Sequence, residues 1–224
     1  VRTTKSKITD AEKAAAIAVI FYVGNELNDE EDTTVRTLGI GIGLAGEKMW
    51  CAYDEYNQEN SANACDEFVE TIFCDPQKSA TYEYLFPNNM YTPNRNGKDN
   101  LSKIGTWLQE NNKTDDTGEP EKYPAFYACK NYSTPATKNT KYDKDGWYLP
   151  TLAELYYALK KIECINDVLQ YCGQPKLNKI DIWTSSLYYK FSLNGAVYFE
   201  AGKNNSFRSK EINELCFVLP IREF

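Results

Sequence analysis

The 224-residue chain has no histidine, no Cys-x-x-Cys pair and no long apolar run. Without histidine it lacks the commonest general base, the commonest metal ligand and the usual catalytic triads. The cysteine spacing matches no zinc site, and the longest apolar run, residues 14–23, is too short to span a membrane. We therefore expect no catalytic residue, no metal and no cofactor.

Positive charge is also scarce, with 25 Lys and Arg against 32 Asp and Glu, a net charge of −7. This balance argues against a nucleic-acid partner, which would be bound through phosphate contacts, and against anionic membrane surfaces. The sequence begins with Val1 and not with Met. We expect a missing leader or lipid anchor to precede Val1, and the chain to reach a membrane only through that anchor.

Two residue types are more abundant and leave alternatives open. Seven cysteines make an odd count, so at least one is unpaired within the chain. Cys164 and Cys172 could bridge a short loop, or they could be buried thiols that act as small apolar residues. The 17 tyrosines suit a recognition surface, where a large ring carries a polar tip, but a β-rich fold also tolerates tyrosine in its strands.

The first half of the chain predicts one strand pair and two helices. Residues 1–13 are polar and predict a flexible tether. β-Branched residues at 17–24 and alternating glycines at 38–44 predict a hairpin with close backbone approach. Apolar spacing predicts helices over residues 61–74 and 101–108.

The second half predicts one well-marked helix and several strands. Residues 126–129 predict a short strand. Thr151 and Glu154 form a capping box that starts a helix, whose apolar face continues to Ile162. A short helical turn is expected at residues 168–171. Strands are then expected at the following segments: 182–185, 196–200 and 215–220. The absence of repeats or composition breaks indicates one domain, residues 1–224.

Three short motifs occupy the last third of the chain in a fixed order. They are Asp-Gly-Trp-Tyr-Leu-Pro-Thr-Leu-Ala-Glu-Leu at residues 145–155, Trp-Thr-Ser-Ser at residues 183–186 and Phe-Val-Leu-Pro-Ile-Arg at residues 217–222. Together they resemble the formylglycine-generating-enzyme-like branch of the C-type lectin fold. Within that branch they look most like the variable proteins of diversity-generating retroelements.

The resemblance implies an α+β, C-type lectin-like domain of the formylglycine-generating-enzyme-like variant, with two main helices packed on short antiparallel strands. It implies that Trp147 and Leu149 are core residues and that Arg222 is structural. It also implies that the motif at residues 183–186 opens a solvent-facing, variable ligand-binding region over residues 183–217.

In such proteins, variation falls on adenine-bearing codons, which can come to encode Tyr, Phe, Leu, Asn, Ser or Arg but not Lys or Glu. The rule therefore disfavours variation at Lys190, Glu200, Lys203 and Lys210. The residues that it permits, and that we expect to be exposed, are Tyr188, Tyr189, Phe191, Leu193, Tyr198, Asn204, Asn205, Ser206 and Arg208.

Some of these candidates could instead have a purely structural role. Tyr198 shares one face of a strand with Ala196 and Glu200, so its ring could instead face the core. Asn204 and Asn205 could form a plain turn.

Other kinds of site fit the sequence less well. A calcium-dependent lectin loop is disfavoured because Gln174-Pro175-Lys176 places a cation where a carboxylate is needed. Formylglycine-generating enzymes use a reactive cysteine pair near the C-terminus. Only Cys216 follows Cys172 here, and it lies in a predicted strand, which favours a buried, inert thiol.

The sequence therefore predicts a ligand-binding protein and not an enzyme. We expect an exported bacterial surface protein, an outer-membrane lipoprotein, that binds a protein or glycan on a host or neighbouring cell. Binding would centre on residues 183–209. The alternatives are an enzyme of the formylglycine-generating or sulfoxide-synthase-like branch, and a non-variable structural lipoprotein domain of the same fold.

Overall fold

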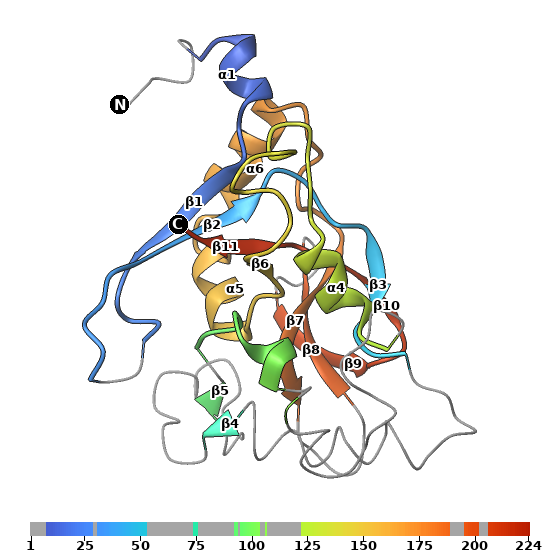
Figure 1. Ribbon diagram of the computed structural model, residues 1–224. Helices are drawn as coiled ribbons and strands as arrows, with labels where there is room; N and C mark the ends of the chain where they lie inside the picture. Colours follow the sequence, from blue (N-terminus) through green and yellow to red (C-terminus); the bar gives the residue numbers. More distant parts are fainter. Residues whose placement is uncertain are drawn as a thin grey trace.

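The computed structural model describes residues 8–28, 31–52, 74–75, 92–93, 95–103, 106, 122–188, 195–201 and 206–224. These residues form an α+β fold (Figure 1), as the sequence predicts. The helices are α1 (Asp10–Ala14), α4 (Pro124–Lys130), α5 (Leu152–Leu159) and α6 (Ile162–Tyr171). None of the helices in this part of the chain is long and apolar enough to cross a membrane.

The strands form two main sheets. One is antiparallel and has the order β1-β2-β11-β6, with β1 (Ala18–Gly24), β2 (Arg36–Gly41), β11 (Ile221–Glu223) and β6 (Trp147–Tyr148). The other has the order β3-β10-β7-β8-β9, with β3 (Glu47–Met49), β10 (Leu215–Phe217), β7 (Asp181–Tyr188), β8 (Gly195–Glu200) and β9 (Ser206–Glu211). Its strands are antiparallel except that β10 and β7 are parallel. A third, two-stranded sheet pairs β4 (Cys74–Asp75) with β5 (Thr92–Pro93).

The predicted opening hairpin is confirmed as β1 and β2. Its glycines serve close approach, as expected, because a Cβ at Gly41 would lie 2.7 Å from the ring of Tyr132. A Cβ at Gly39 would likewise lie 2.8 Å from the ring of Phe224. The alternating glycines therefore let aromatic side chains lie directly on the strand.

The capping box at the start of α5 is also confirmed, since Thr151 Oγ1 accepts from the Glu154 amide at 3.2 Å and the Glu154 carboxylate accepts from the Thr151 amide at 2.9 Å. The predicted continuous face to Ile162 is wrong. The helix ends at Leu159, and a second helix, α6, begins at Ile162. Lys160 and Lys161, both exposed, lie between the two helices, and the backbone of Lys161 (φ −113°, ψ 16°) departs from helical values, so the helix is interrupted before Ile162. The turn expected at residues 168–171 is the last part of α6.

Two other predictions fail. Residues 126–129 lie in α4 and not in a strand, because Pro124 starts a helix whose inner face buries Ala125, Phe126 and Cys129. Residues 10–14 of the expected tether form α1, which begins with a capping box between Thr9 and Glu12.

Some expected elements fall outside the described residues. Of the helix expected at 61–74, only residue 74 is described, and it lies in β4. Of the helix expected at 101–108, residues 101–103 and 106 are helical and the others lie outside the described residues.

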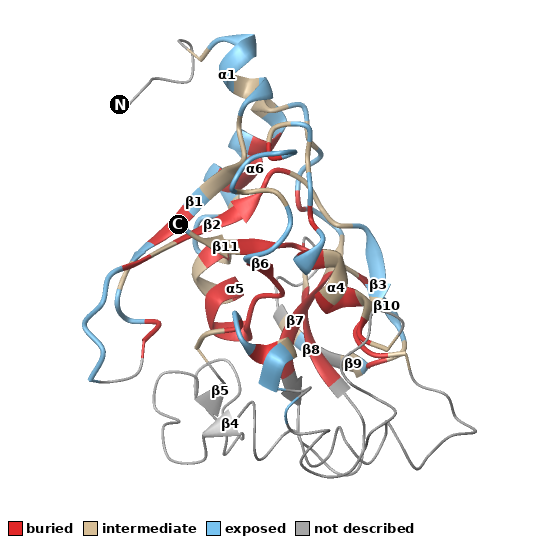
Figure 2. Cartoon of the chain, in the orientation of Figure 1, coloured by how far each residue is buried: buried red, intermediate tan, exposed pale blue. Residues whose placement is uncertain are grey.

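The five-stranded sheet lies between two apolar clusters. Along β8, Ala196 and Tyr198 belong to a cluster with Trp50 and Phe126 beneath α4. The alternate side chains of β8 belong to a second cluster, which includes buried residues of β1, β2, α5 and α6. Figure 2 shows this burial along β7, β8 and α5, in contrast to the exposed α1. Both faces of the central strands are therefore covered.

Candidate ligand-binding surface

The Trp-Thr-Ser-Ser motif lies at the start of β7 and is completely buried. The Trp183 indole donates to the Lys48 carbonyl at 2.8 Å, and the Trp50 indole donates to the Thr184 carbonyl at 2.9 Å. The indole N–H is the only hydrogen-bond donor of a tryptophan side chain, and in both residues it has an acceptor. Buried polar groups are generally paired in this way. The expectation that the solvent-facing surface opens at this motif is wrong, because the motif anchors β7 in the core.

The two serines of the motif hold β7 to the segment that begins α5. The Ser185 amide donates to the Pro150 carbonyl at 2.7 Å, and the Ser186 hydroxyl accepts from the Leu152 amide at 3.0 Å. Asn100, also buried, donates to the Ser185 hydroxyl at 2.7 Å. The first and second motifs are therefore bonded directly to one another.

The third motif joins the first through Arg222. Its guanidinium donates to the carbonyls of Asp145 at 2.8 Å and Lys141 at 3.1 Å. It also lies 5.8 Å from the centroid of the Trp147 ring. Trp147 and Leu149 are buried. The predicted core and structural roles of these residues agree with the structure.

A buried carboxylate lies at the centre of this scaffold. Glu154 accepts from the Tyr148 hydroxyl at 2.9 Å, from the Gly97 amide at 3.2 Å and from Arg36 Nη2 at 2.9 Å. Burial raises the pKa of Glu154 above its usual value, although the hydrogen bond from the Thr151 amide, the charge of Arg36 and the bond from Tyr148 act in the opposite direction. The sequence indicates Glu154 as a capping residue, but no pattern places Arg36, 118 residues away, beside it.

The candidate surface is formed by β8 and β9, the strand at the edge of the sheet. Tyr198 lies opposite Arg208 in the register, and Ala196 lies opposite Lys210. The sequence did not predict β9 because its pattern is short and highly charged. Charged side chains on an edge strand are a common protection against unwanted pairing.

Two cations of β9 differ in their surroundings. Arg208 is half exposed, 50%, and lies 3.3 Å from the carboxylate of Glu200. Lys210 is only 19% exposed and contacts Asp181 on β7 at 2.9 Å. Burial lowers the pKa of Lys210, but the hydrogen bond to Asp181 and the nearby charges raise it by more, so the net shift is upward. Lys210 therefore ties the edge strand to the centre of the sheet.

Tyr198 is not exposed, contrary to the expectation that it belongs to a binding surface. Only 8% of the residue is accessible. Its ring meets that of Trp183 edge to face at 6.1 Å, with Lys210 Nζ 4.9 Å from its centroid. Burial and the charge of Asp181 raise the pKa of its hydroxyl. The alternative, a strand residue that faces the core, is correct, because side chains of one parity on β8 enter the Trp50 cluster.

The other candidates are described only in part. Tyr188 and Ser206 lie in β7 and β9, and their side chains are outside the description. The remaining candidates fall outside the described residues: Tyr189, Phe191, Leu193, Asn204 and Asn205. Apart from Tyr198, the candidates form two groups in the sequence, one that begins at Tyr188 at the end of β7 and one that ends in β9. Tyr188 pairs with Gly195 at one end of β8, and Ser206 pairs with Glu200 at the other end, about 17 Å away at the usual rise per residue.

No disulfide joins any of Cys129, Cys164, Cys172 and Cys216. Cys164 and Cys172 are free, so the short bridge between them does not form. Both belong to the α6 region, about 12 Å apart along the helix axis, beyond the reach of a disulfide. Cys216 is buried, and burial raises its pKa to about 12. Among the described residues, no three His, Cys, Asp or Glu side chains are grouped so as to hold a metal ion.

Comparison of the chain with models of known protein families and with curated proteins finds no match.

Proposed function

We propose that this protein is a non-enzymatic ligand-binding protein with a C-type lectin-like domain of the formylglycine-generating-enzyme-like variant. A diversity-generating retroelement varies its C-terminal strands and the connections between them. The protein is exported and displayed on a bacterial surface through a lipid anchor, and its ligand is a protein or a glycan on a host or neighbouring cell.

The observation that carries the proposal is the difference in exposure among the charged residues of β8 and β9. Arg208, which the codon rule permits to vary, is half exposed, and its replacement removes little packing. Glu200 and Lys210, which the rule protects, are 13% and 19% exposed and hold the strands together. Tyr198 is the exception, since it is permitted to vary and is buried.

The three motifs support the proposal by forming a fixed scaffold below this surface. Their side chains and backbone bond to one another through Pro150, Ser185 and Arg222, and none of these contacts uses a candidate residue. A scaffold whose stability does not depend on the varied positions can accept many substitutions there. Holding the varied side chains on rigid strands also keeps the entropy cost of binding low.

The chemistry of the candidates suits recognition. Tyrosine and phenylalanine supply contact area at low conformational cost, whereas Asn, Ser and Arg supply adaptable hydrogen bonds. We therefore expect the protein to bind its ligand noncovalently, with aromatic side chains at the centre of the interface and polar contacts around them.

The diversification is tested by sequencing the gene and its flanking DNA in many isolates of the source. We expect substitutions concentrated at adenine-bearing codons between Tyr188 and Arg208, outside Tyr198, and a near-identical template copy nearby. Substitutions spread evenly along the chain, with no template copy, would overturn it and favour the non-variable structural domain.

Binding is tested by presenting the full chain to arrays of purified extracellular proteins and glycans, followed by two triple variants. One replaces Tyr188, Tyr189 and Phe191 by alanine, and the other replaces Asn204, Asn205 and Arg208. Tyr198 is left unchanged because it is buried. We expect one triple variant to lose more than about tenfold in affinity, since truncated aromatic or arginine anchors typically cost over 1 kcal/mol each.

A matched control replaces three exposed residues elsewhere by alanine: Val35, Lys138 and Glu163. This variant is expected to bind as the unchanged chain does. Unfolding midpoints in urea show whether each variant remains folded. If both triple variants remain folded and bind with unchanged affinity, the C-terminal surface is not the binding site.

A further inference from the structure

A small cavity lies where the first of the three motifs meets α4. Its volume is 190 Å³, and it is lined by residues from the ranges 97–102 and 145–149 and by two residues of α4. Figure 1 shows α4 beside β6, the strand that residues 147–148 form. None of the lining residues belongs to the candidate ligand-binding surface, and nothing in the proposed function requires this cavity.

The floor of the cavity is apolar and fixed. Phe126, Trp147 and Leu149 line it and are buried. The Trp147 indole donates to the Tyr142 carbonyl at 2.9 Å. The Phe126 ring meets the Trp50 ring edge to face, with the centroids 4.9 Å apart. Because these side chains are already ordered, an apolar group that packs against them costs the protein little further conformational freedom.

Two lysines from different segments stand at the rim of the cavity. Lys98 and Lys130 both line it, and both residues are exposed. Neither ammonium group takes part in an ion pair within the described part of the chain. Lys130 Nζ lies 5.7 Å from the centroid of the Tyr127 ring, a contact that leaves its N–H groups available to an oxygen acceptor. Two ammonium groups are therefore available to a bound anion.

Asp145 is the third charged residue that lines the cavity. Its backbone carbonyl accepts from Arg222 at 2.8 Å, whereas its carboxylate has no ion pair with any described residue. The lining therefore has two cations and one anion, although the whole chain has a net charge of −7. An excess of one positive charge favours a ligand with a single negative charge.

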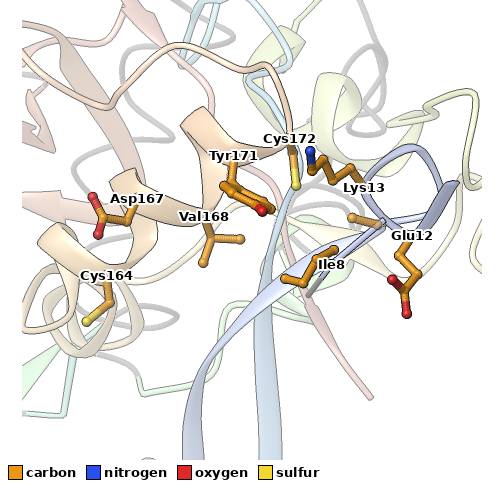
Figure 3. A pocket seen from close by; sticks show the side chains of 9 residues that line it. Ile8, Glu12, Lys13, Cys164, Asp167, Val168, Tyr171 and Cys172 are labelled. Carbon is orange, nitrogen blue, oxygen red and sulfur yellow. The ribbon is translucent and has the colours of Figure 1, made fainter. Parts of the chain in front are cut away.

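The surroundings of the cavity have the same sign of charge. Residues 95–103 include three cations and one anion, and residues 122–145 include five cations and two anions. A larger cavity between α1 and α6 has the opposite balance, since Glu12, Lys13 and Asp167 line it (Figure 3). Of these two cavities, only the smaller one suits an anion.

The volume of the cavity limits the size of the ligand. An apolar cavity of about 150 Å³ is large enough to hold benzene. The 190 Å³ found here therefore accommodate an apolar body of about the size of one ring. With that body on the apolar floor, a carboxylate attached to it reaches the charged rim.

We propose that this cavity binds a small organic carboxylate. The apolar body of the ligand packs against Trp147 and Leu149, and its carboxylate lies at the rim beside Lys98 and Lys130. Burial of the apolar body supplies most of the affinity. The two exposed lysines add a smaller amount and select the charge of the ligand.

The test titrates the full chain with benzoate and follows the backbone amides by NMR. The ionic strength is kept low, because salt screens exposed charges. We expect saturable shifts at residues 97–102 and 145–149, and none at residues 162–172 of the larger cavity. The affinity for benzoate is expected to exceed that for benzyl alcohol about threefold or more, as two exposed ion pairs imply, and benzylamine is expected to bind most weakly of the three. Formate, which has the charge without the ring, is expected to bind at least about tenfold more weakly than benzoate.

Charge variants test the rim separately from the floor. Lys98→Gln with Lys130→Gln is expected to remove the preference for benzoate over benzyl alcohol and to leave the affinity for benzyl alcohol unchanged. Asp145→Asn is expected to strengthen benzoate binding about twofold, since it removes a repelling charge. Lys138→Gln with Lys176→Gln changes the net charge equally at two exposed lysines that do not line the cavity. This control is expected to keep the preference.

Four outcomes would overturn the proposal. The first is an absence of saturable shifts around the cavity. The second is equal affinity for benzoate and benzyl alcohol, which would show that the lysines do not select a charge. The third is equal affinity for formate and benzoate, which would show that the apolar floor is not used. The fourth is an equal loss of preference in the two double lysine variants, which would show that only the net charge of the chain matters.

Discussion

Arg36 and Glu154 form an ion pair of 2.9 Å in which the side chains are only 5% and 0% exposed. The pair joins β2 to the first turn of α5, and Tyr148 on β6 bonds to the same carboxylate. Removing one partner of such a buried pair strongly destabilises a fold, because the other charge loses its buried counter-charge. Without Glu154, Arg36 would keep only Glu223, whose carboxylate lies 3.4 Å from Arg36 Nε and whose side chain is 29% exposed.

Glu154→Gln is therefore expected to lower the free energy of unfolding by about 3–5 kcal/mol, the range for breaking a buried ion pair. Urea unfolding at neutral pH measures the change. Glu163→Gln, at an exposed position on α6, is the matched control and is expected to change stability by less than about 0.5 kcal/mol. Adding Arg36→Met to Glu154→Gln is expected to restore part of the loss. Failure of this rescue would mean that the loss of the buried counter-charge of Arg36 is not the cause of the destabilisation.

Gly97 is expected to tolerate no side chain. A Cβ there would lie 2.6 Å from the Leu149 carbonyl and 3.2 Å from the Glu154 carboxylate. Gly97→Ala should cost about 1–3 kcal/mol, the usual penalty for overpacking a filled site. Thermal and urea unfolding measure it against Lys98→Ala, at the exposed neighbouring position. Equal stability of the two variants would contradict the close approach seen in the structure.

Arg222→Lys is expected to loosen the turn that precedes β6. The guanidinium donates to several carbonyls there, and a lysine ammonium cannot reproduce that planar fork. We expect a loss of about 1–2 kcal/mol, from two unmade hydrogen bonds, and faster amide exchange at residues 142–147. Arg208→Lys makes the same chemical change at a half-exposed site. If both variants behave alike, the structural role of Arg222 is refuted.

Cys216 is expected to make the fold sensitive to alkali. Burial raises its pKa from the usual 9.0 to about 12, so between these pH values the folded chain keeps a proton that the unfolded chain loses. The stability that this group contributes is present below pH 9.0 and is lost as the pH rises toward about 12.

Cys216→Val should therefore reduce the slope of stability against pH in that window by at most about 1.4 kcal/mol per pH unit, the value for one proton. Urea unfolding at several pH values measures the slope. Part of the slope is expected to remain, because burial also raises the pKa of other thiols and tyrosines, among them Cys129 and Tyr132. Cys164→Ala, at an exposed thiol, should leave the slope as it is, and an unchanged slope in Cys216→Val would show that this thiol does not contribute.

Local patterns in the sequence determined several elements. The capping box of Thr151 and Glu154, the glycine alternation of β2 and the β-branched run of β1 each specify their structure through neighbouring residues. Where two local patterns indicated different structures, the prediction from the sequence was wrong. The aromatic run at residues 126–129 suggested a strand, but Pro124 and the packing of Phe126 on Trp50 selected a helix.

The tertiary structure alone decided which side chains are buried and which charges are paired. Periodicity placed Tyr198 on one face of a strand, but a strand covered on both faces has no solvent side, so the pattern could not reveal its burial. Arg36 and Glu154 meet across 118 residues, and Lys98 and Lys130 line one cavity from separate segments of the chain. Such relationships depend on how elements come together in space, and no short-range pattern encodes them.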